Sequence, residues 1–431
     1  MRQKPFQADN FLKANSYQLL ALITINIIWF LRCRDRLIVA DFWAEDGTVF
    51  FQQAIEKGWQ SLFSSYGGYY HLLPRLIAFG ASYLPFTLAV YLIPFLAFIF
   101  AGYVFSLLLH KDYNQIAPDF FTRFCLCILL TLTPGLGEIA CNITGLHWIC
   151  WVYLALISVR NIDASTSYAK LFLILVCVLT EGATILLLPV FIYRFYLTVQ
   201  TPQAKTECTK LALIILSISA SSLLNYLHRI PETNLNTELG YLSLIWLKAS
   251  TSGLFFETWI KDIIYQISSL AVLFITLACW LLVVRSAAIC ATAESKLFTM
   301  LALCASFWPL FITMARNKAG YLFMYHLPWP QWEDFRYAFI LPAISPLILA
   351  TIARLILGKN RKLYMVSIFI LMIIASYRAT DRFNIKAYSS DPQWRYYSDQ
   401  VNALLSNNTT GQIQIPISPS GWSMDLSNKA N

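Results

Sequence analysis

The sequence predicts an all-α polytopic membrane protein, and three observations support that prediction. Of the 431 residues, 58% are hydrophobic and only 13% are charged, so too few polar groups remain to cover a soluble domain. Apolar runs close to the roughly 20 residues needed to cross a bilayer recur along the whole chain. These runs lack the alternation of barrel strands, so the spans are expected to be helices that satisfy their own backbone groups.

The apolar runs predict a bundle of about eleven transmembrane helices. The first is followed by Arg32-Cys-Arg-Asp-Arg36 rather than by a small-residue cleavage site, so we expect it to stay as a membrane anchor. A later run is interrupted by Thr180-Glu-Gly182, which predicts either one broken helix or two short ones. The predicted spans are 17–31, 87–109, 119–134, 147–159, 169–180, 183–197, 210–227, 263–284, 297–315, 337–357 and 363–379.

Charge distribution predicts the orientation of the bundle. Arg2, Lys4 and Lys13 precede the first span, so the positive-inside rule places the N-terminus in the cytoplasm, and an odd number of spans places the C-terminus outside. Other basic residues fall on the loops expected inside, where the net charge of +9 faces anionic lipid, so the charge implies no nucleic-acid partner. The basic residues of those loops are Arg160, Lys170, Arg194, Lys205, Lys210, Arg285, Lys296, Lys359, Arg361 and Lys362.

The long segments are all expected on the outer, periplasmic side. They are rich in Trp, Tyr and Pro rather than in disorder-promoting residues, so we expect them to pack together over the bundle. We therefore divide the chain into a transmembrane domain, 1–380, and a periplasmic tail, 381–431. Within the tail, Gln412 to Met424 alternates like a short strand and then turns, which predicts that it folds back onto the outer loops. The other outer segments are 32–86, 228–262 and 316–336.

Candidate chemistry is densest on the first outer loop, 32–86. Asp41, Glu45 and Asp46 place three carboxylates within six positions, and a carboxylate is a suitable base for removing a proton from an acceptor hydroxyl. These three are the candidate catalytic residues. The structural alternative is that Asp46 caps a helix from Thr48 to Lys57 that Gly58 ends. That role would leave Asp41 and Glu45 without a structural task.

Cations on the same side are candidates for holding a phosphate as it leaves with growing negative charge. Arg75 begins a short segment, Pro74 to Leu84, that is too short to cross the bilayer and is expected to lie along its surface. Lys318 and Arg336 lie on a later outer loop, at the depth expected of a lipid phosphate. The alternative for each cation is contact with lipid headgroups alone.

A second polar patch, from Thr133 to Trp148, lies between two predicted spans. Residues of this patch, together with two residues that precede Arg75, are candidates for binding the substrate. For His147 the alternative is a structural role near the end of a span. Glu181 is unusual because an ionisable group within an apolar run costs about 2.5 to 3.5 kcal/mol unless it faces a cavity or a partner. The candidate substrate-binding residues are Tyr69, His71, Glu138, Asn142, His147 and Trp148.

Other nucleotide or cofactor motifs are missing from the sequence. It contains no Gly-Lys-Ser/Thr phosphate loop, no nucleophile elbow and no His/Cys metal spacing, and the ten cysteines are scattered. We therefore expect no resident cofactor and no nucleotide as direct donor. A divalent metal bridging the carboxylates is left open.

The stretch Trp43-Ala-Glu-Asp-Gly47, followed by a Tyr/His-rich approach to Pro74-Arg75, resembles bacterial integral membrane glycosyltransferases of the GT-C fold. It is most similar to the serotype-converting O-antigen glucosyltransferases of temperate phages and their bacterial relatives. Three further segments are similar to recurrent features of such proteins: Asn142 to Trp148, Phe335-Arg-Tyr337 and Pro419 to Met424.

The resemblance implies transfer of glucose from undecaprenyl-phosphate-glucose to a sugar hydroxyl of O-antigen, at the periplasmic face of the bacterial inner membrane. A polyprenyl-phosphate-sugar donor, a lipid-linked glycan acceptor and the lipid bilayer would then be the partners. Glu45 and Asp46 would be the acidic pair of the family, with one of them as base. The family pattern leaves the role of Asp41 open.

Three other classes of protein compete with this reading. A flippase or transporter of lipid-linked sugars would predict internal repeats and charges along a central path, whereas the carboxylates here gather on one face. An O-antigen polymerase is a closer alternative, but it usually has its longest outer loop late in the chain. A structural membrane component would not need the dense acid and arginine chemistry of residues 41–75.

Overall fold

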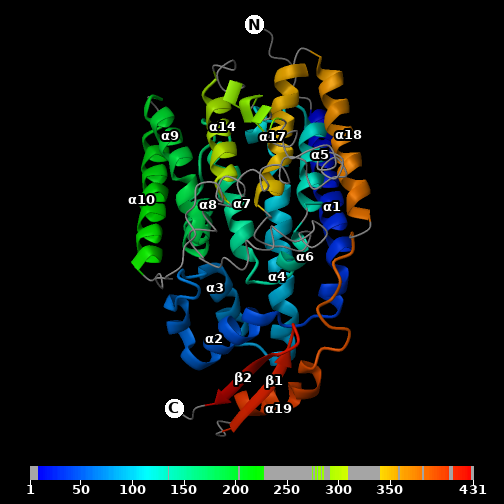
Figure 1. The fold of residues 1–431 in the computed structure, drawn as a ribbon, viewed down its shortest axis with the longest axis vertical. Helices are drawn as coiled ribbons and strands as arrows, with labels where there is room; N and C mark the ends of the chain where they lie inside the picture. Colours follow the sequence, from blue (N-terminus) through cyan, green and yellow to red (C-terminus); the bar gives the residue numbers. More distant parts are fainter. Residues whose placement is uncertain are drawn as a thin grey trace.

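The protein, seen here in a computed structural model, is an elongated bundle of helices with a small two-stranded hairpin at one end (Figure 1). The structure describes residues 8–133, 135–201, 204–227, 292–308, 340–357, 360–380, 383–406 and 411–428, with scattered positions between 274 and 285. Mostly helical structure agrees with the predicted all-α membrane fold. We refer to the end that carries the hairpin as the hairpin end.

The bundle surrounds the helix α7 (Leu146–Val159), all of whose side chains are buried. A helix that is apolar on every side belongs in the interior of a bundle. The other long helices are α1 (Ala8–Ile38), α4 (Phe86–Ser106), α5 (Phe120–Thr131), α8 (Tyr168–Thr180), α9 (Leu188–Val199), α10 (Lys205–Leu227), α14 (Ala293–Ser306), α17 (Ile340–Leu357) and α18 (Arg361–Thr380). Of these, the helices α4, α8, α9, α14 and α17 pack against α7.

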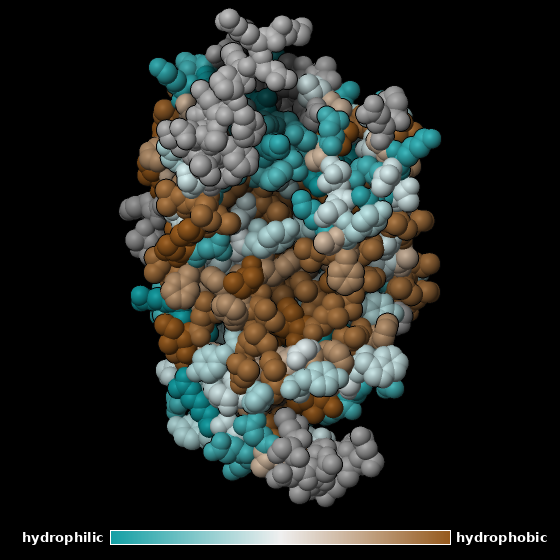
Figure 2. Space-filling view, turned by 180° about the vertical axis from the view of Figure 1, so that it is seen from behind, coloured by the Kyte–Doolittle hydropathy of each residue, from teal (hydrophilic) through white to brown (hydrophobic). Residues whose placement is uncertain are grey.

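Four helical segments in the described ranges are long and apolar enough to cross a membrane, and six apolar helices are shorter. The predicted total of about eleven spans is thus matched only in part, and the predicted span 263–284 lies largely outside the described residues. Figure 2 shows a continuous hydrophobic belt between two hydrophilic ends, as expected for a bilayer environment. The four segments are Ser16–Ile38, Phe86–Leu109, Gly182–Val199 and Lys205–Leu227.

The first helix is longer than its predicted span, because α1 continues through the arginines that were expected to form a loop. Arg32 donates to the carbonyl oxygens of Thr131 and Thr133, and Arg36 donates to that of Ala140 over 2.7 Å. Carbonyl groups at a helix end lack partners within the helix and carry partial negative charge. The two buried arginines therefore satisfy the polypeptide that follows α5 instead of facing water.

The interruption at Glu181 separates two helices, which decides between the two predicted alternatives. Glu181 has an extended backbone, and a 3-10 segment, η5 (Gly182–Leu187), connects it to α9. The chain therefore turns between α8 and α9 (Figure 1), and the turn packs against Tyr69, since a β-carbon added to Gly182 would lie 3.2 Å from the Tyr69 ring.

Short elements cover the hairpin end. The tail residues form α19 and an antiparallel hairpin in which Ile415 is the partner of Met424, and the hairpin packs against the first outer loop. The predicted folding back of the tail is thus confirmed, and so is Gly58 as the end of α2, with a φ of 54°. These elements are η1 (Asp46–Phe51), α2 (Gln52–Lys57), η2 (Gly58–Phe63), α3 (Leu72–Ala81), α6 (Leu136–Ile139), α19 (Trp394–Ser406), β1 (Gly411–Ile417) and β2 (Trp422–Asn428).

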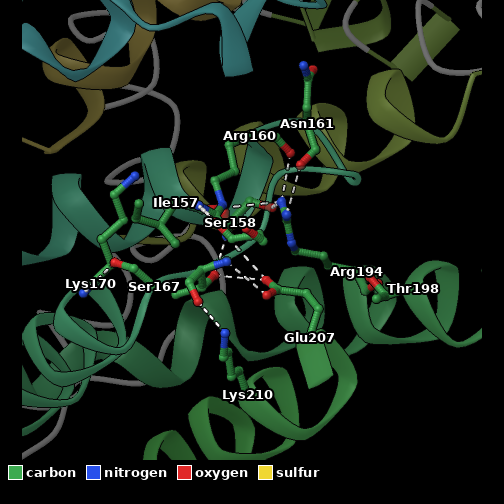
Figure 3. Close-up of polar contacts among 12 residues, drawn as sticks. Ile157, Ser158, Arg160, Asn161, Ser167, Lys170, Arg194, Thr198, Glu207 and Lys210 are labelled. Atoms are coloured by element: carbon green, nitrogen blue, oxygen red, sulfur yellow. Dashed lines mark hydrogen bonds and ion pairs between the residues drawn. The ribbon is translucent and has the colours of Figure 1, made fainter. Parts of the chain in front are cut away.

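A cluster of buried charges ties three helices together at the opposite end (Figure 3). Arg160, at the end of α7, forms an ion pair with Glu207 of α10 over 3.2 Å. Arg194 of α9 donates to the carbonyl oxygens of Arg160 over 2.7 Å and Asn161 over 2.9 Å. Because a buried charge is tolerated only when it is paired and hydrogen-bonded, this cluster fixes how α7, α9 and α10 meet. Three of the basic residues assigned to inner loops, Arg160, Arg194 and Lys210, thus lie together, with Lys210 donating to Thr166.

Candidate active site

The three carboxylates lie in the segment that follows α1: Asp46 begins η1, a segment with π-helical hydrogen bonding, Glu45 directly precedes it, and Asp41 comes earlier in the chain. Such segments are rare and occur often at functional sites. All three side chains are buried, but each meets a different set of partners. The structure therefore separates their roles, which the sequence could not do.

Asp46 stabilises the start of α7. Its carboxylate accepts hydrogen bonds from the backbone N–H groups of Ile143 over 3.0 Å and Thr144 over 2.9 Å, and from the Thr144 hydroxyl over 2.5 Å. Burial raises the pKa of Asp46 to about 7, although these hydrogen bonds act in the opposite direction. The predicted cap on the helix of residues 48–57 is wrong, because Asp46 is itself the first residue of η1 and its carboxylate instead holds the turn that leads into α7.

Asp41 has a structural partner that the sequence did not reveal. The hydroxyl of Ser418, in the tail, donates to Asp41 Oδ2 over 2.6 Å. Burial raises the pKa of Asp41 to about 6, and the hydrogen bond from Ser418 lowers it. Asp41 therefore links the tail to the loop, and this contact accounts for its presence without a catalytic role.

Glu45 is the carboxylate whose contacts leave room for a proton transfer. The Tyr66 hydroxyl donates to Glu45 Oε1 over 3.3 Å. Within the described ranges no donor reaches Glu45 Oε2, although the side chain is only 8% exposed. Asp41 Oδ1 is likewise buried without a donor among the described residues, but a short hydrogen bond from Ser418 holds the other Asp41 oxygen. Glu45 has only the longer and weaker bond from Tyr66, so it is the strongest candidate base of the three.

Arg75, in the first turns of α3, is a buried cation without a carboxylate partner among the described residues. Its guanidinium donates to the Tyr70 carbonyl oxygen and to Gln53 Oε1, each over 3.0 Å, and lies 5.3 Å from the centre of the Phe50 ring. Burial lowers the pKa of Arg75 to about 10, and Nη2 has no acceptor in the described part of the chain. This nitrogen is suited to an anion. Lys318 and Arg336, the other two predicted phosphate ligands, lie outside the described residues.

A cluster of aromatic and histidine side chains connects the segment of Asp41, Glu45 and Asp46, here called the carboxylate loop, to the second polar patch, Thr133 to Trp148. Tyr69 stacks on His71 with ring centres 4.0 Å apart, and His71 lies 5.4 Å from His147. His147 in turn lies 4.2 Å from Trp148. His71 has a left-handed backbone with a φ of 51°, which costs free energy in a residue other than glycine and tends to persist at functional sites. The structure thus brings four of the predicted substrate-binding residues together.

Glu181 belongs to this cluster, although we did not include it among the predicted site residues. Its Oε2 lies 2.6 Å from His147 Nδ1, and its Oε1 accepts from the Ala183 N–H over 2.8 Å. An ionised Glu181 therefore fixes the His147 ring with a proton on Nδ1. The signal in the sequence was a carboxylate interrupting an apolar run, but only the fold identifies its partner.

Asn142 has a structural role instead of the predicted contact with substrate. Its Oδ1 accepts from the Gly145 N–H, and its Nδ2 donates to the Glu138 carbonyl oxygen over 2.6 Å and to the Tyr388 hydroxyl over 2.7 Å. These bonds hold the turn that leads into α7. Glu138 is partly exposed on the same turn, in α6.

A metal site is not evident in the described residues, where no three His, Cys, Asp or Glu side chains converge. Asp41, Glu45 and Asp46 follow one another closely in the chain yet contact separate partners, so the geometry gives no support to the metal bridge that the sequence left open. No family model, curated protein or solved structure matches the chain. The chemistry of the site must therefore be argued from its residues.

Proposed function

We propose that the protein is a membrane glycosyltransferase that transfers a hexosyl group, glucosyl by the resemblance, from a polyprenyl-phosphate-sugar to a glycan acceptor, with O-antigen as the expected class of acceptor. The elements that carry Gln53 and Arg75, α2 and α3, lie at the hairpin end of the bundle (Figure 1). A substrate with a lipid tail and a polar head would be handled at that end of the bundle. The periplasmic face of the bacterial inner membrane is the location that this proposal implies.

One observation carries the proposal: Glu45 and Arg75 are buried opposite charges on one loop-and-helix unit that do not form an ion pair with each other. Phe50 lies between them, with its ring 6.2 Å from that of Tyr66, which holds Glu45, and 5.3 Å from the Arg75 guanidinium. Keeping opposite charges apart and dry is costly for stability. Such an arrangement is typical of a functional site, where the separated groups are needed for the reaction although they lower stability.

These two groups suit an inverting single displacement. The acceptor hydroxyl oxygen attacks the anomeric carbon of the donor sugar while Glu45 takes the hydroxyl proton. The bond between the anomeric carbon and the phosphate oxygen breaks, and its electron pair leaves with the polyprenyl phosphate. Arg75 Nη2 faces the charge that develops on that phosphate, and donors placed in advance in a dry site are worth more than donors in water.

The aromatic and histidine cluster supports binding of a sugar. Apolar faces of pyranose rings pack on aromatic side chains, whereas sugar hydroxyls need a few fixed polar groups. Tyr69 and Trp148 provide the rings, and His147, held by Glu181, provides an oriented polar group. Asp46 contributes indirectly, because its bonds to residues 143 and 144 place the start of α7 beside the carboxylate loop.

The proposal is tested with purified protein in lipid nanodiscs, a labelled polyprenyl-phosphate-hexose and an acceptor glycan. Glu45→Gln keeps the size of the side chain and removes its basicity, so transfer should fall by about 10²-fold or more. The matched control is Glu56→Gln, because Glu56 is an exposed residue of α2 whose carboxylate accepts a hydrogen bond from Gln52 Nε2 over 3.0 Å. Near-normal turnover in correctly folded Glu45→Gln would disprove the assigned base, and no transfer by the wild type with any polyprenyl-phosphate-hexose would disprove the function.

A further inference from the structure

The C-terminal tail supplies much of the backbone hydrogen bonding of the segment that precedes Glu45. Ser418 accepts from the Ala44 N–H over 2.5 Å and donates its own N–H to the Phe42 carbonyl oxygen over 3.2 Å. Trp394 Nε1 donates to the Ala40 carbonyl oxygen over 2.8 Å. Three backbone groups between the end of α1 and the start of η1 therefore have tail residues as partners.

Ser418 also makes the side-chain contact with Asp41, so one tail residue forms hydrogen bonds with Asp41, Phe42 and Ala44 of the loop. Trp43 and Ser418 pair as in a parallel sheet. The packing is close on the other side of Glu45 as well, since a β-carbon added to Gly47 would lie 2.8 Å from Ile417 Cδ1. The hairpin thus contacts the chain both before and after Glu45.

Tyr388 forms a second point of attachment, on a stretch of the tail before α19. Its ring lies 4.5 Å from that of Trp43 and 3.8 Å from the Arg36 guanidinium. Its hydroxyl accepts from Arg36 Nη1 over 2.8 Å and is bonded to Asn142. Tyr388 therefore joins three parts of the site region: the end of α1, the carboxylate loop and the turn that leads into α7.

From these contacts we infer that the tail is a positioning unit of the active site, in which Ser418 and Tyr388 hold residues 41–44 so that Glu45 meets the acceptor hydroxyl. This inference rests on the proposed function and deepens it. A base must be held within about 0.5 Å of its productive position, and the residues that hold it must themselves be fixed. Loss of that support can reduce a rate by about 10²-fold without altering the reacting groups.

Substitution at Ser418 tests the inference through catalytic constants. Ser418→Ala should lower kcat about 10-fold and leave KM unchanged, because the substrate-binding cluster is not altered, and Ser418→Thr should restore kcat by returning the hydroxyl. Asp41→Ala, which removes the acceptor, should lower kcat similarly, and the double variant should be no worse than either single one, because both act through one contact. Ser423→Ala is the matched control, because Ser423 lies in the same hairpin and contacts Gln414.

Hydrogen exchange adds a readout that does not depend on activity. Exchange of the amides in residues 40–45 should be faster in Ser418→Ala and in Tyr388→Ala than in the wild type or Ser423→Ala. Faster exchange together with reduced kcat supports the inference. Unchanged kcat in Ser418→Ala, with or without faster exchange, overturns it while leaving the proposed function intact, provided that Glu45→Gln is inactive. A wild type without transfer activity overturns the proposed function and this inference together.

Discussion

Substitution of Arg75 distinguishes most clearly between a structural role and a role in the transfer reaction. Its side chain is 1% exposed, and burial lowers its pKa from 12.5 to about 10. At about 1.36 kcal/mol per unit, holding the charge there costs about 3 kcal/mol, and less after solvent screening. The two hydrogen bonds to Tyr70 and Gln53 are enough to offset this cost, since bonds from charged donors contribute about 1.5 to 3 kcal/mol each.

The variant Arg75→Met removes both the free-energy cost of burying the charge and the hydrogen bonds that compensate for it. We expect the free energy of unfolding to change by only about 1 kcal/mol in either direction, in contrast with about 3 to 5 kcal/mol for breaking a buried ion pair. If Arg75 faces the leaving phosphate, transfer should fall by about 10² to 10³, the usual effect of losing one well-placed donor. Arg75→Lys should recover only part of the activity, because an ammonium keeps the charge but not the planar fork.

Two measurements on the same preparations check this prediction: thermal unfolding in nanodiscs, and hexose transfer from a labelled polyprenyl phosphate. Lys57→Met serves as the control, because Lys57 is exposed at the end of α2 and should change neither measurement. A large drop in Tm for Arg75→Met would make Arg75 a structural residue. Normal transfer by a stable Arg75→Met would refute its role at the phosphate.

Two further predictions concern stability. Arg194→Ala should lower Tm by several degrees, because it leaves buried carbonyl groups at the end of α7 without their charged donor, a loss of about 3 kcal/mol or more. The control is Arg34→Ala, which should leave Tm unchanged because the Arg34 side chain is 55% exposed. Equal effects of the two substitutions would contradict the structural role of the cluster in Figure 3. The pKa of Asp46 rises from 3.8 to about 7 on folding, so between these pH values the folded protein keeps a proton that the unfolded chain loses. The wild type should therefore lose stability relative to Asp46→Asn as pH increases from about 4 to about 7. A Tm difference that is constant over this range would show that Asp46 does not titrate there.

The sequence determined the general character of this protein. Long apolar runs demand helices that satisfy their own backbone groups, and their lengths placed most of the described helices to within a few residues, as for α7 (Leu146–Val159) against the predicted 147–159. Gly58 as the end of α2 and the short strand in the tail were likewise predictable, because glycine in a left-handed turn and period-two alternation are local signals. Concentration of carboxylates after the first span indicated where to look for a site.

Only the tertiary structure separated the roles of those carboxylates. Asp41, Glu45 and Asp46 are equivalent in a sequence, but Asp41 meets Ser418 across 377 positions and Asp46 meets Thr144 across 98. Glu181 likewise contacts a residue that is distant in the sequence, because its partner His147 belongs to α7. The physical reason is that the role of a carboxylate, in holding a turn, linking two segments or accepting a proton, depends on the donors that surround it. Those donors come from segments that folding brings together, which no local pattern specifies.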